Sequence, residues 1–346
     1  MTNKNRRIRG KSGWGIGPVL MLLALAAGLP AQTQDIPAPD GKLLALDPAG
    51  PGERARLFAP GGVTSPFSEW GMTIAPGGDE IFYTLEIRDV SGQYKTFIAG
   101  MRWANGAWTR PEILSFSNTA ADSQPVLSRD GLSLIFCSRR PLDAQDRSGD
   151  DNFWRVDRNA GSWGVPTPLE AVNSEADETM PFIDGNGDLY FCAALNGARS
   201  PQHIFVSKFV QGEFEKPEQL KGGVNTPGGE YNPTFSPDGR LLFLELVDAP
   251  GGLGGGDIYF SRKAADGTWG EPVNLGNVLN TRFSECRLLY SPGGSCVFFQ
   301  SIRPPRLGGP NNSLTYNLLL WNSSVIAPES FDFYWMAASA LERALK

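Results

Sequence analysis

Five acidic side chains recur at a nearly constant spacing and are the residues best placed to do chemistry. Each lies seven residues before the second residue of a tight turn, and successive acids are 53, 56, 52 and 55 residues apart. The five, called the ring acids below, are Glu69, Asp122, Glu178, Glu230 and Glu285. Carboxylates gathered in one place bind cations such as Ca²⁺. Two carboxyls at a defined separation serve as acid and base in glycoside hydrolysis.

The ring acids could instead hold the structure together. Each carboxylate would then accept hydrogen bonds from backbone N–H groups or from an Arg of the neighbouring repeat. Recurrence in every repeat favours this role, because a catalytic pair needs only two carboxyls in two different environments. We therefore rank a structural role first, ligand or cation binding second and catalysis third.

The elements that carry these acids are short strands in a repeat of about 54 residues. Gly and Pro make up 68 of 346 residues, which favours turns and strands over long helices. In each unit the acid begins an apolar strand, and a Gly-rich turn joins it to a second strand. A third strand with an Ile-Tyr-like pair follows in all five units. A Gly-x-aromatic turn and a Pro-led outer strand come next in the first four. Such four-stranded units are blades of a β-propeller, in which Trp108, Trp163 and Trp269 are packing residues.

Five units predict an all-β propeller of five four-stranded blades. The fifth unit lacks an outer strand, whereas residues 54–60 form an outer strand without a blade of its own. We expect this N-terminal strand to complete the last blade and close the ring, which also covers open sheet edges. The alternative is six blades, with residues 304–328 supplying extra strands. Residues 337–345 are rich in Ala and Leu and predict a short capping helix.

Two segments resemble a known family. Residues 236–239, Ser-Pro-Asp-Gly, followed by Asp-Ile-Tyr at 257–259, are similar to the PD40 or WD40-like β-propeller repeat of TolB-like periplasmic proteins. The sequence Asp-Phe-Tyr-Trp at 332–335 resembles the ending of exported bacterial PD40 proteins. The resemblance covers residues 54–346 and implies a propeller. It implies little about activity, because propellers host many unrelated functions.

The N-terminus predicts export. Five basic residues and no acid precede an apolar run at 19–29, which ends in Leu-Pro-Ala before residue 32. This order is typical of a Sec-type signal peptide, with cleavage after Ala31. The run is about half of the ~20 residues that a membrane-spanning helix needs. We therefore expect a signal peptide at 1–31, a linker at 32–53 and one propeller domain at 54–346, periplasmic or secreted and without stable membrane insertion.

Net charge limits the classes of partner, and the cysteine pattern predicts the state of the thiols. Without residues 1–31 the chain keeps 26 of its 31 Lys and Arg against 37 Asp and Glu, a net charge of −11. Such a surface repels nucleic acid. We expect the partner to be a protein or glycan of the cell envelope. We also expect the protein to be a monomer. The four cysteines, Cys137, Cys192, Cys286 and Cys296, are expected to be buried thiols. We expect no cofactor, with Ca²⁺ at the ring acids as the one candidate.

Our main functional hypothesis is an exported, non-enzymatic propeller that binds a protein or glycan. The alternative is a glycan-acting hydrolase that uses carboxylates of the central channel. No catalytic residue is assigned. The candidate ligand-binding residues are the ring acids together with three neighbours. Trp70 lies beside Glu69 and outside the repeat pattern, and Arg139 and Arg303 follow the second strands of units two and five.

Overall fold

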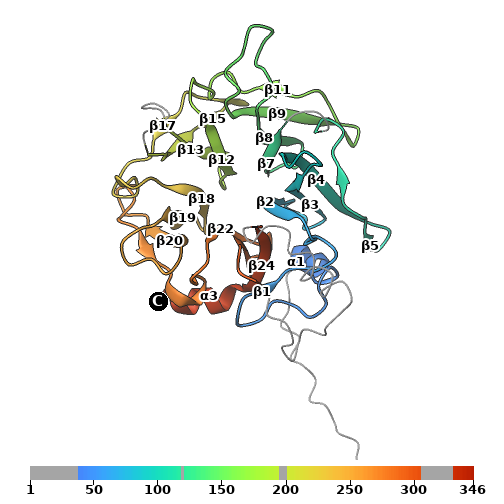
Figure 1. The fold of residues 1–346 in the computed structure, drawn as a ribbon. Helices are drawn as coiled ribbons and strands as arrows, with labels where there is room; N and C mark the ends of the chain where they lie inside the picture. Colours follow the sequence, from blue (N-terminus) through green and yellow to red (C-terminus); the bar gives the residue numbers. More distant parts are fainter. Residues whose placement is uncertain (1–37, 118–120, 195–200, 305–329) are drawn as a thin grey trace, which may run out of the picture. The chain divides into compact units, whose positions relative to one another are not determined.

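The described residues form five antiparallel blades around a common axis, with a separate two-stranded hairpin at the third blade (Figure 1). The computed structural model describes residues 38–117, 121–194, 201–304 and 330–346, which all belong to one compact unit, Ile36–Lys346. In each sheet the strand that begins near a ring acid lies innermost, and later strands lie farther out. The predicted all-β propeller with five blades is confirmed.

Blades one to three follow one another along the chain. Blade one contains β2 (Ser68–Ile74), β3 (Glu80–Arg88), β4 (Tyr94–Ala104), β5 (Ala107–Trp108) and β6 (Glu112–Ile113). Blade two contains β7 (Asp122–Leu127), β8 (Ser133–Ser138), β9 (Asn152–Asn159), β10 (Ser162–Trp163) and β11 (Thr167–Pro168). Blade three contains β12 (Glu178–Ile183), β13 (Leu189–Ala193), β14 (His203–Ser207) and β17 (Glu218–Gln219), with the small hairpin of β15 (Phe209–Val210) and β16 (Glu213–Phe214).

Blades four and five complete the ring. Blade four contains β18 (Tyr231–Phe235), β19 (Leu241–Val247), β20 (Gly256–Arg262) and β21 (Val273–Asn274), followed by a 3-10 turn, η1 (Gly276–Val278). Blade five contains β22 (Glu285–Tyr290), β23 (Cys296–Ser301), β24 (Asp332–Ala337) and the N-terminal β1 (Arg56–Leu57). The α-helices within the described ranges are α1 (Ala38–Leu44) and α3 (Ala338–Ala344).

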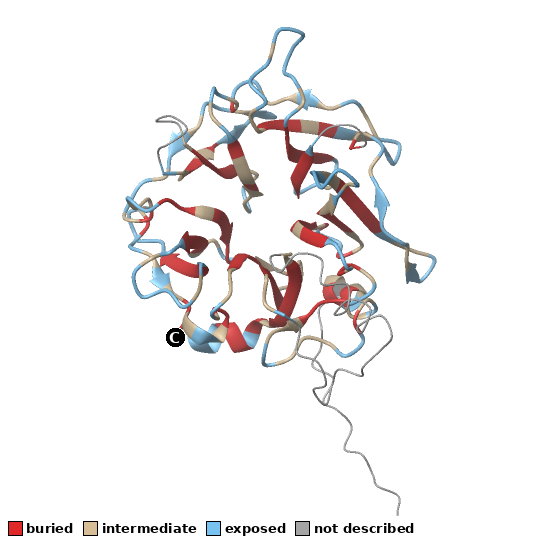
Figure 2. Cartoon of the chain, viewed as in Figure 1, coloured by how far each residue is buried: buried red, intermediate tan, exposed pale blue. Residues whose placement is uncertain are grey.

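The inner and central strands are buried on both faces because each blade packs between two others. Every residue of β7, β8 and β23 is buried. Figure 2 shows this burial in the strands and the exposed connections around the outside. The apolar clusters span neighbouring blades: one joins Tyr190 and Ile204 of blade three to Leu242 and Tyr259 of blade four. The four cysteines are free and buried, as expected.

The ring closes through the N-terminal strand. Arg56 and Leu57 of β1 pair with Trp335 and Tyr334 of β24. The next residue, Phe58, is fully buried, with its ring 4.9 Å from that of Phe298 and 5.0 Å from that of Trp335. The alternative of six blades required extra strands at 304–328, nearly all of which lies outside the described residues.

The described part of the segment before the first blade packs on blades one and five. Residues 32–53 are expected to be a linker, but their described part contains α1. Asp40 accepts hydrogen bonds from the side chain of Ser291 (2.8 Å) and the backbone N–H of Gly293 (2.8 Å), in the turn of blade five. Leu43 is fully buried against blades one and five. Residues 1–31, the expected signal peptide, lie outside the described residues. Neither described helix is long and apolar enough to cross a membrane.

We expect Phe58→Ala to destabilise the whole ring. The substitution leaves a cavity where the first and last blades meet, and truncation of a buried Phe costs about 3–5 kcal/mol. Guanidinium unfolding measures this loss. Tyr94→Ala is the control, because Tyr94 is 57% exposed and its loss should change stability by no more than about 0.5 kcal/mol. A loss below ~1 kcal/mol for Phe58→Ala would mean that other contacts hold the ring closed.

Candidate functional site

The ring acids lie at the starts of the innermost strands, as the repeat predicts. Asp122, Glu178 and Glu285 are the first residues of β7, β12 and β22, Glu69 is the second residue of β2, and Glu230 directly precedes β18. All five are fully buried. None of these carboxyls is therefore presented to a ligand in solution.

In each described loop before a ring acid, the residue four positions before the acid donates a hydrogen bond to its carboxylate. Thr281 donates its backbone N–H (2.6 Å) and its hydroxyl (2.7 Å) to Glu285. The backbone N–H of Thr226 donates to Glu230 (2.6 Å). Ser65 and Ser174 donate their hydroxyls to Glu69 and Glu178 in the same way. The position four residues before Asp122 lies outside the described residues. The acids therefore fix the loops that lead from one blade to the next.

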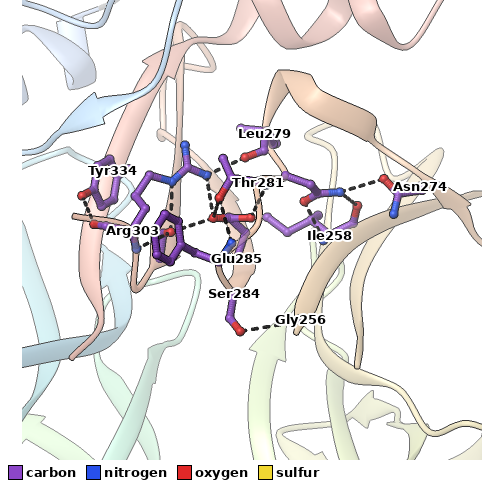
Figure 3. A network of polar contacts seen from close by, with 12 residues as sticks. Gly256, Ile258, Asn274, Leu279, Thr281, Ser284, Glu285, Arg303 and Tyr334 are labelled. Atoms are coloured by element: carbon purple, nitrogen blue, oxygen red, sulfur yellow. Dashed lines mark hydrogen bonds and ion pairs between the residues drawn. The ribbon is translucent and has the colours of Figure 1, made fainter. Parts of the chain in front are cut away.

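An Arg or His side chain lies beside three of the ring acids. Nη2 of Arg140 donates to both oxygens of Asp122 (2.7 and 2.8 Å), and Nδ1 of His203 lies 2.9 Å from Glu230. Figure 3 shows the third case, in which Nη2 of Arg303 lies 3.0 Å from Glu285. The Arg303 guanidinium also covers the rings of Phe299 and Tyr334, at 4.9 and 5.2 Å. The two Arg side chains neutralise buried charge within their own blades, and His203 links blade three to blade four.

The other candidate residues are not all gathered around the ring acids. Arg139, predicted at the channel mouth, is 59% exposed at its side chain and pairs with Asp151 (2.9 Å). Arg140 holds Asp122 instead. It stands two residues after Ser138, as Arg303 stands two residues after Ser301, so the shared Ser-x-Arg spacing is the signal that could have identified it. Trp70 is half-buried in β2 and pairs across the sheet with Thr84.

Two ring acids have no cationic partner among the described residues. Burial raises the pKa of Glu69 well above its ordinary value, and the nearby charge of Asp332 adds to this effect. Burial also raises the pKa of Glu178 to about 7, and its Oε2 has no hydrogen-bond partner in the described structure. Burial raises the pKa of Asp332 to about 8. At all three carboxyls, burial disfavours the charged form.

A β-bulge follows every ring acid, and sequence reasoning missed it. The register shifts in all five innermost strands at the same place. The residue two positions after each acid has a positive φ: Gly71, Gln124, Met180, Asn232 and Arg287. Bulges re-aim the chain, and here they aim it at the preceding blade. The N–H of Gln124 donates to Thr84 (2.7 Å), that of Met180 to Gln124 (2.5 Å), and that of Asn232 to Sδ of Met180 (3.3 Å). The Arg287 guanidinium instead donates to the carbonyl of Pro181 (3.1 Å), and so reaches from blade five past blade four to blade three.

The geometry gives the ring acids a structural role. Glycoside hydrolysis needs two carboxyls that contact the substrate, whereas these are enclosed and bonded to their own loops. In the described part of the chain, no three His, Cys, Asp or Glu side chains lie close enough together to hold a metal ion.

Two surface hollows lie next to each other between blades two and three. The first has a volume of about 210 Å³ and is lined by Ile135, Ile183, Phe209 and Phe214, with Arg129 at its edge. The second, of about 750 Å³, is lined by the segments 167–172 and 212–214 and by Asp157. Arg155 and Phe214 line both hollows. We call them together the 2/3 groove. It offers aromatic rings, guanidinium groups and carboxylates to a ligand, and sequence reasoning did not identify it.

Comparison with known proteins gives similarity of fold only. No protein-family model matches the sequence, and no curated protein matches it significantly. Similar solved structures include a puromycin-hydrolyzing peptidase of Mycobacterium tuberculosis (14% identity, TM-score 0.39), the exo-β-1,3-galactanase 1,3Gal43A of Clostridium thermocellum (14%, 0.45) and a thermostable family-43 glycoside hydrolase (10%, 0.44). The matches cover 76%, 73% and 69% of this chain, and 36%, 58% and 84% of those chains. This chain thus spans little more than a third of the peptidase. The printed activities are those of the other proteins.

We expect Glu178→Gln to stabilise the protein at pH 8 and to have little effect at pH 4. Because burial raises the pKa of Glu178 from 4.5 to about 7, its folded form holds a proton that the unfolded chain releases. Its contribution to stability is complete below about pH 4.5 and is lost as the pH rises through 7. The neutral amide avoids this loss, which is on the order of 3 kcal/mol. Unfolding at both pH values measures the difference.

Glu285→Gln is the contrasting variant. It removes the anionic partner of Arg303 and should therefore destabilise the protein at pH 7, by about 3 kcal/mol for a buried pair. If Glu178→Gln were equally destabilising at pH 8, the Glu178 side chain would be ionised and stabilised by contacts other than those described.

Proposed function

We propose that this chain is a non-enzymatic binding propeller whose ligand docks in the 2/3 groove. The observation that carries the proposal is the complete burial of all five ring acids, the residues with the pattern best suited to chemistry. With these acids committed to the fold, the exposed chemistry of the 2/3 groove is the best candidate for function.

The groove has the features of a recognition site. Ligand sites are concave, with apolar walls and a few polar groups that fix orientation. Phe209 is 38% exposed and its ring lies 4.8 Å from that of Phe214, which is half-buried. Arg155 is held by Asp157, at 2.7 Å from its Nε. Strands on both sides hold these side chains, so a ligand would meet a pre-formed surface, which reduces the entropy lost on binding.

We propose export to the cell envelope and membership of the PD40 family as parts of the same proposal. The basic and apolar N-terminus supports export, and the Ser-Pro-Asp-Gly turn at 236–239 supports membership of the PD40 family. The partner would then be a protein or glycan of the cell envelope, bound by a monomer. The acidity of the chain without residues 1–31 supports a partner other than nucleic acid.

A glycan-acting hydrolase is the second candidate, and one observation favours it. Burial raises the pKa of Glu178 to about 7 and that of Asp332 to about 8, which is the range of a general acid near neutral pH. This mechanism requires the channel mouth to open, since Glu178 is fully buried and Asp332 nearly so.

One comparison separates the two candidates. We expect the chain lacking residues 1–31 to retain a ligand from envelope extract or a glycan array, and a Phe209→Ser/Arg155→Glu double variant to lose at least tenfold of that retention. Asp332→Asn should bind as the wild type does. Incubation with a polysaccharide panel should release no reducing sugar. Sugar release that is lost in Glu178→Gln or Asp332→Asn, with folding intact, would establish the hydrolase instead.

A further inference from the structure

The repeat places an indole in the space between neighbouring blades, which we call a wedge. In blade two, Trp163 lies in the wedge toward blade one, with its ring 5.7 Å from that of Phe82 and the Arg158 guanidinium 4.3 Å above it. In blade four, Trp269 packs in one cluster with Tyr190 of blade three and has the Lys263 ammonium 5.4 Å away. In both wedges a cation covers the indole.

Blade three departs from this pattern at both positions. Phe214 takes the place of the indole and joins the cluster between blades two and three. Phe209 pairs with it across the hairpin, as Arg158 pairs with Trp163 and Lys263 with Trp269. The cation and the indole are thus both replaced by phenyl rings, and the ring of Phe214 is smaller than the indole whose place it takes. The first hollow of the 2/3 groove lies at this place.

Cations line this hollow from the side of blade two. The Arg129 guanidinium donates a hydrogen bond to the carbonyl of Gly185 in blade three, and so links the two blades beside the hollow. Arg155 uses its Nε for Asp157 (2.7 Å) and is 30% exposed at its side chain. A guanidinium next to a π face is attractive. An aromatic ring placed in the hollow would therefore meet phenyl walls and a cation, as the indoles of the other two wedges do.

The second hollow carries the opposite charge. Asp157, Glu170 and Glu213 line it and are exposed, with Arg155 as its one basic residue. In the described structure, neither Glu170 nor Glu213 forms an ion pair within 4.0 Å. The carboxylates that line this hollow would attract a basic group.

We infer that the 2/3 groove binds a peptide segment of a partner protein in which an aromatic residue is followed by Lys or Arg. The aromatic side chain would fill the wedge as the missing indole, and the basic side chain would lie against Glu170 and Glu213. This inference rests on the proposed binding function and names its partner.

Replacing Phe214 by Trp, which fills the wedge with a side chain of the protein itself, tests the inference. The probes are three acetylated and amidated peptides, Gly-Ser-Trp-Lys-Ser-Gly and its Ala-Lys and Trp-Glu counterparts, titrated into the chain lacking residues 1–31. We expect saturable binding of the Trp-Lys peptide and at least a tenfold loss for each counterpart. Phe214→Trp should fill the wedge, weaken that binding at least tenfold and leave the melting temperature equal or higher. Trp163→Phe is the matched control, expected to lower the melting temperature and leave binding unchanged.

Charge reversal tests the second hollow on exposed residues that do not disturb the core. The Glu170→Lys/Glu213→Lys double variant should lose the preference for Trp-Lys and bind the Trp-Glu peptide at least as well. Equal binding of Trp-Lys and Ala-Lys peptides, or wild-type affinity in folded Phe214→Trp, would overturn the inference. If no peptide binds while a glycan does so in the same groove, the inference fails but the proposed binding function stands. Sugar release dependent on Glu178 would end both.

Discussion

The pairing of β1 with β24 is the contact on which the rest of the ring depends. A propeller is a chain of blades with two open ends unless the first and last are joined, and here two residues, Arg56 and Leu57, join them. Phe58, buried against Phe298 and Trp335, strengthens the closure with apolar contact. Helix α1 adds a second link, because Asp40 bonds the turn of blade five and Leu43 packs against blades one and five. Closure covers the sheet edges and holds every other blade between two neighbours.

Within that ring, the buried carboxyls of the ring acids hold the loops that connect one blade to the next. A charged group removed from water is costly unless it is paired and hydrogen-bonded, and the ring acids solve this in two ways. Asp122, Glu230 and Glu285 have a guanidinium or imidazole beside them. Glu69 and Glu178 have Ser hydroxyls and no described cation, and the pKa of each is raised because burial disfavours the charged form. Acids that resemble catalytic groups by type and spacing therefore serve the fold.

Function is then expected where the repeat is broken rather than where it is kept. Trp163 and Trp269 fill their wedges under a cation. The pair Phe209 and Phe214 leaves a hollow between blades two and three, with Arg155 and Arg129 at its border. In blade three these two side chains lie on a separate small hairpin, β15 and β16, and the surface there offers aromatic and charged contacts.

The sequence by itself determined the architecture: the five blades, their order, the closing N-terminal strand and the place of each ring acid. These follow from local patterns that repeat, because turn residues and apolar alternation act within a few residues of one another. Tertiary structure decided what the residues do. The bulge after each acid, the choice of Arg140 over Arg139 for Asp122 and the packing of residues 38–53 on the ring depend on contacts across blades. The hollow beside Phe214 depends on the volume that two blades leave between them, which no single repeat encodes.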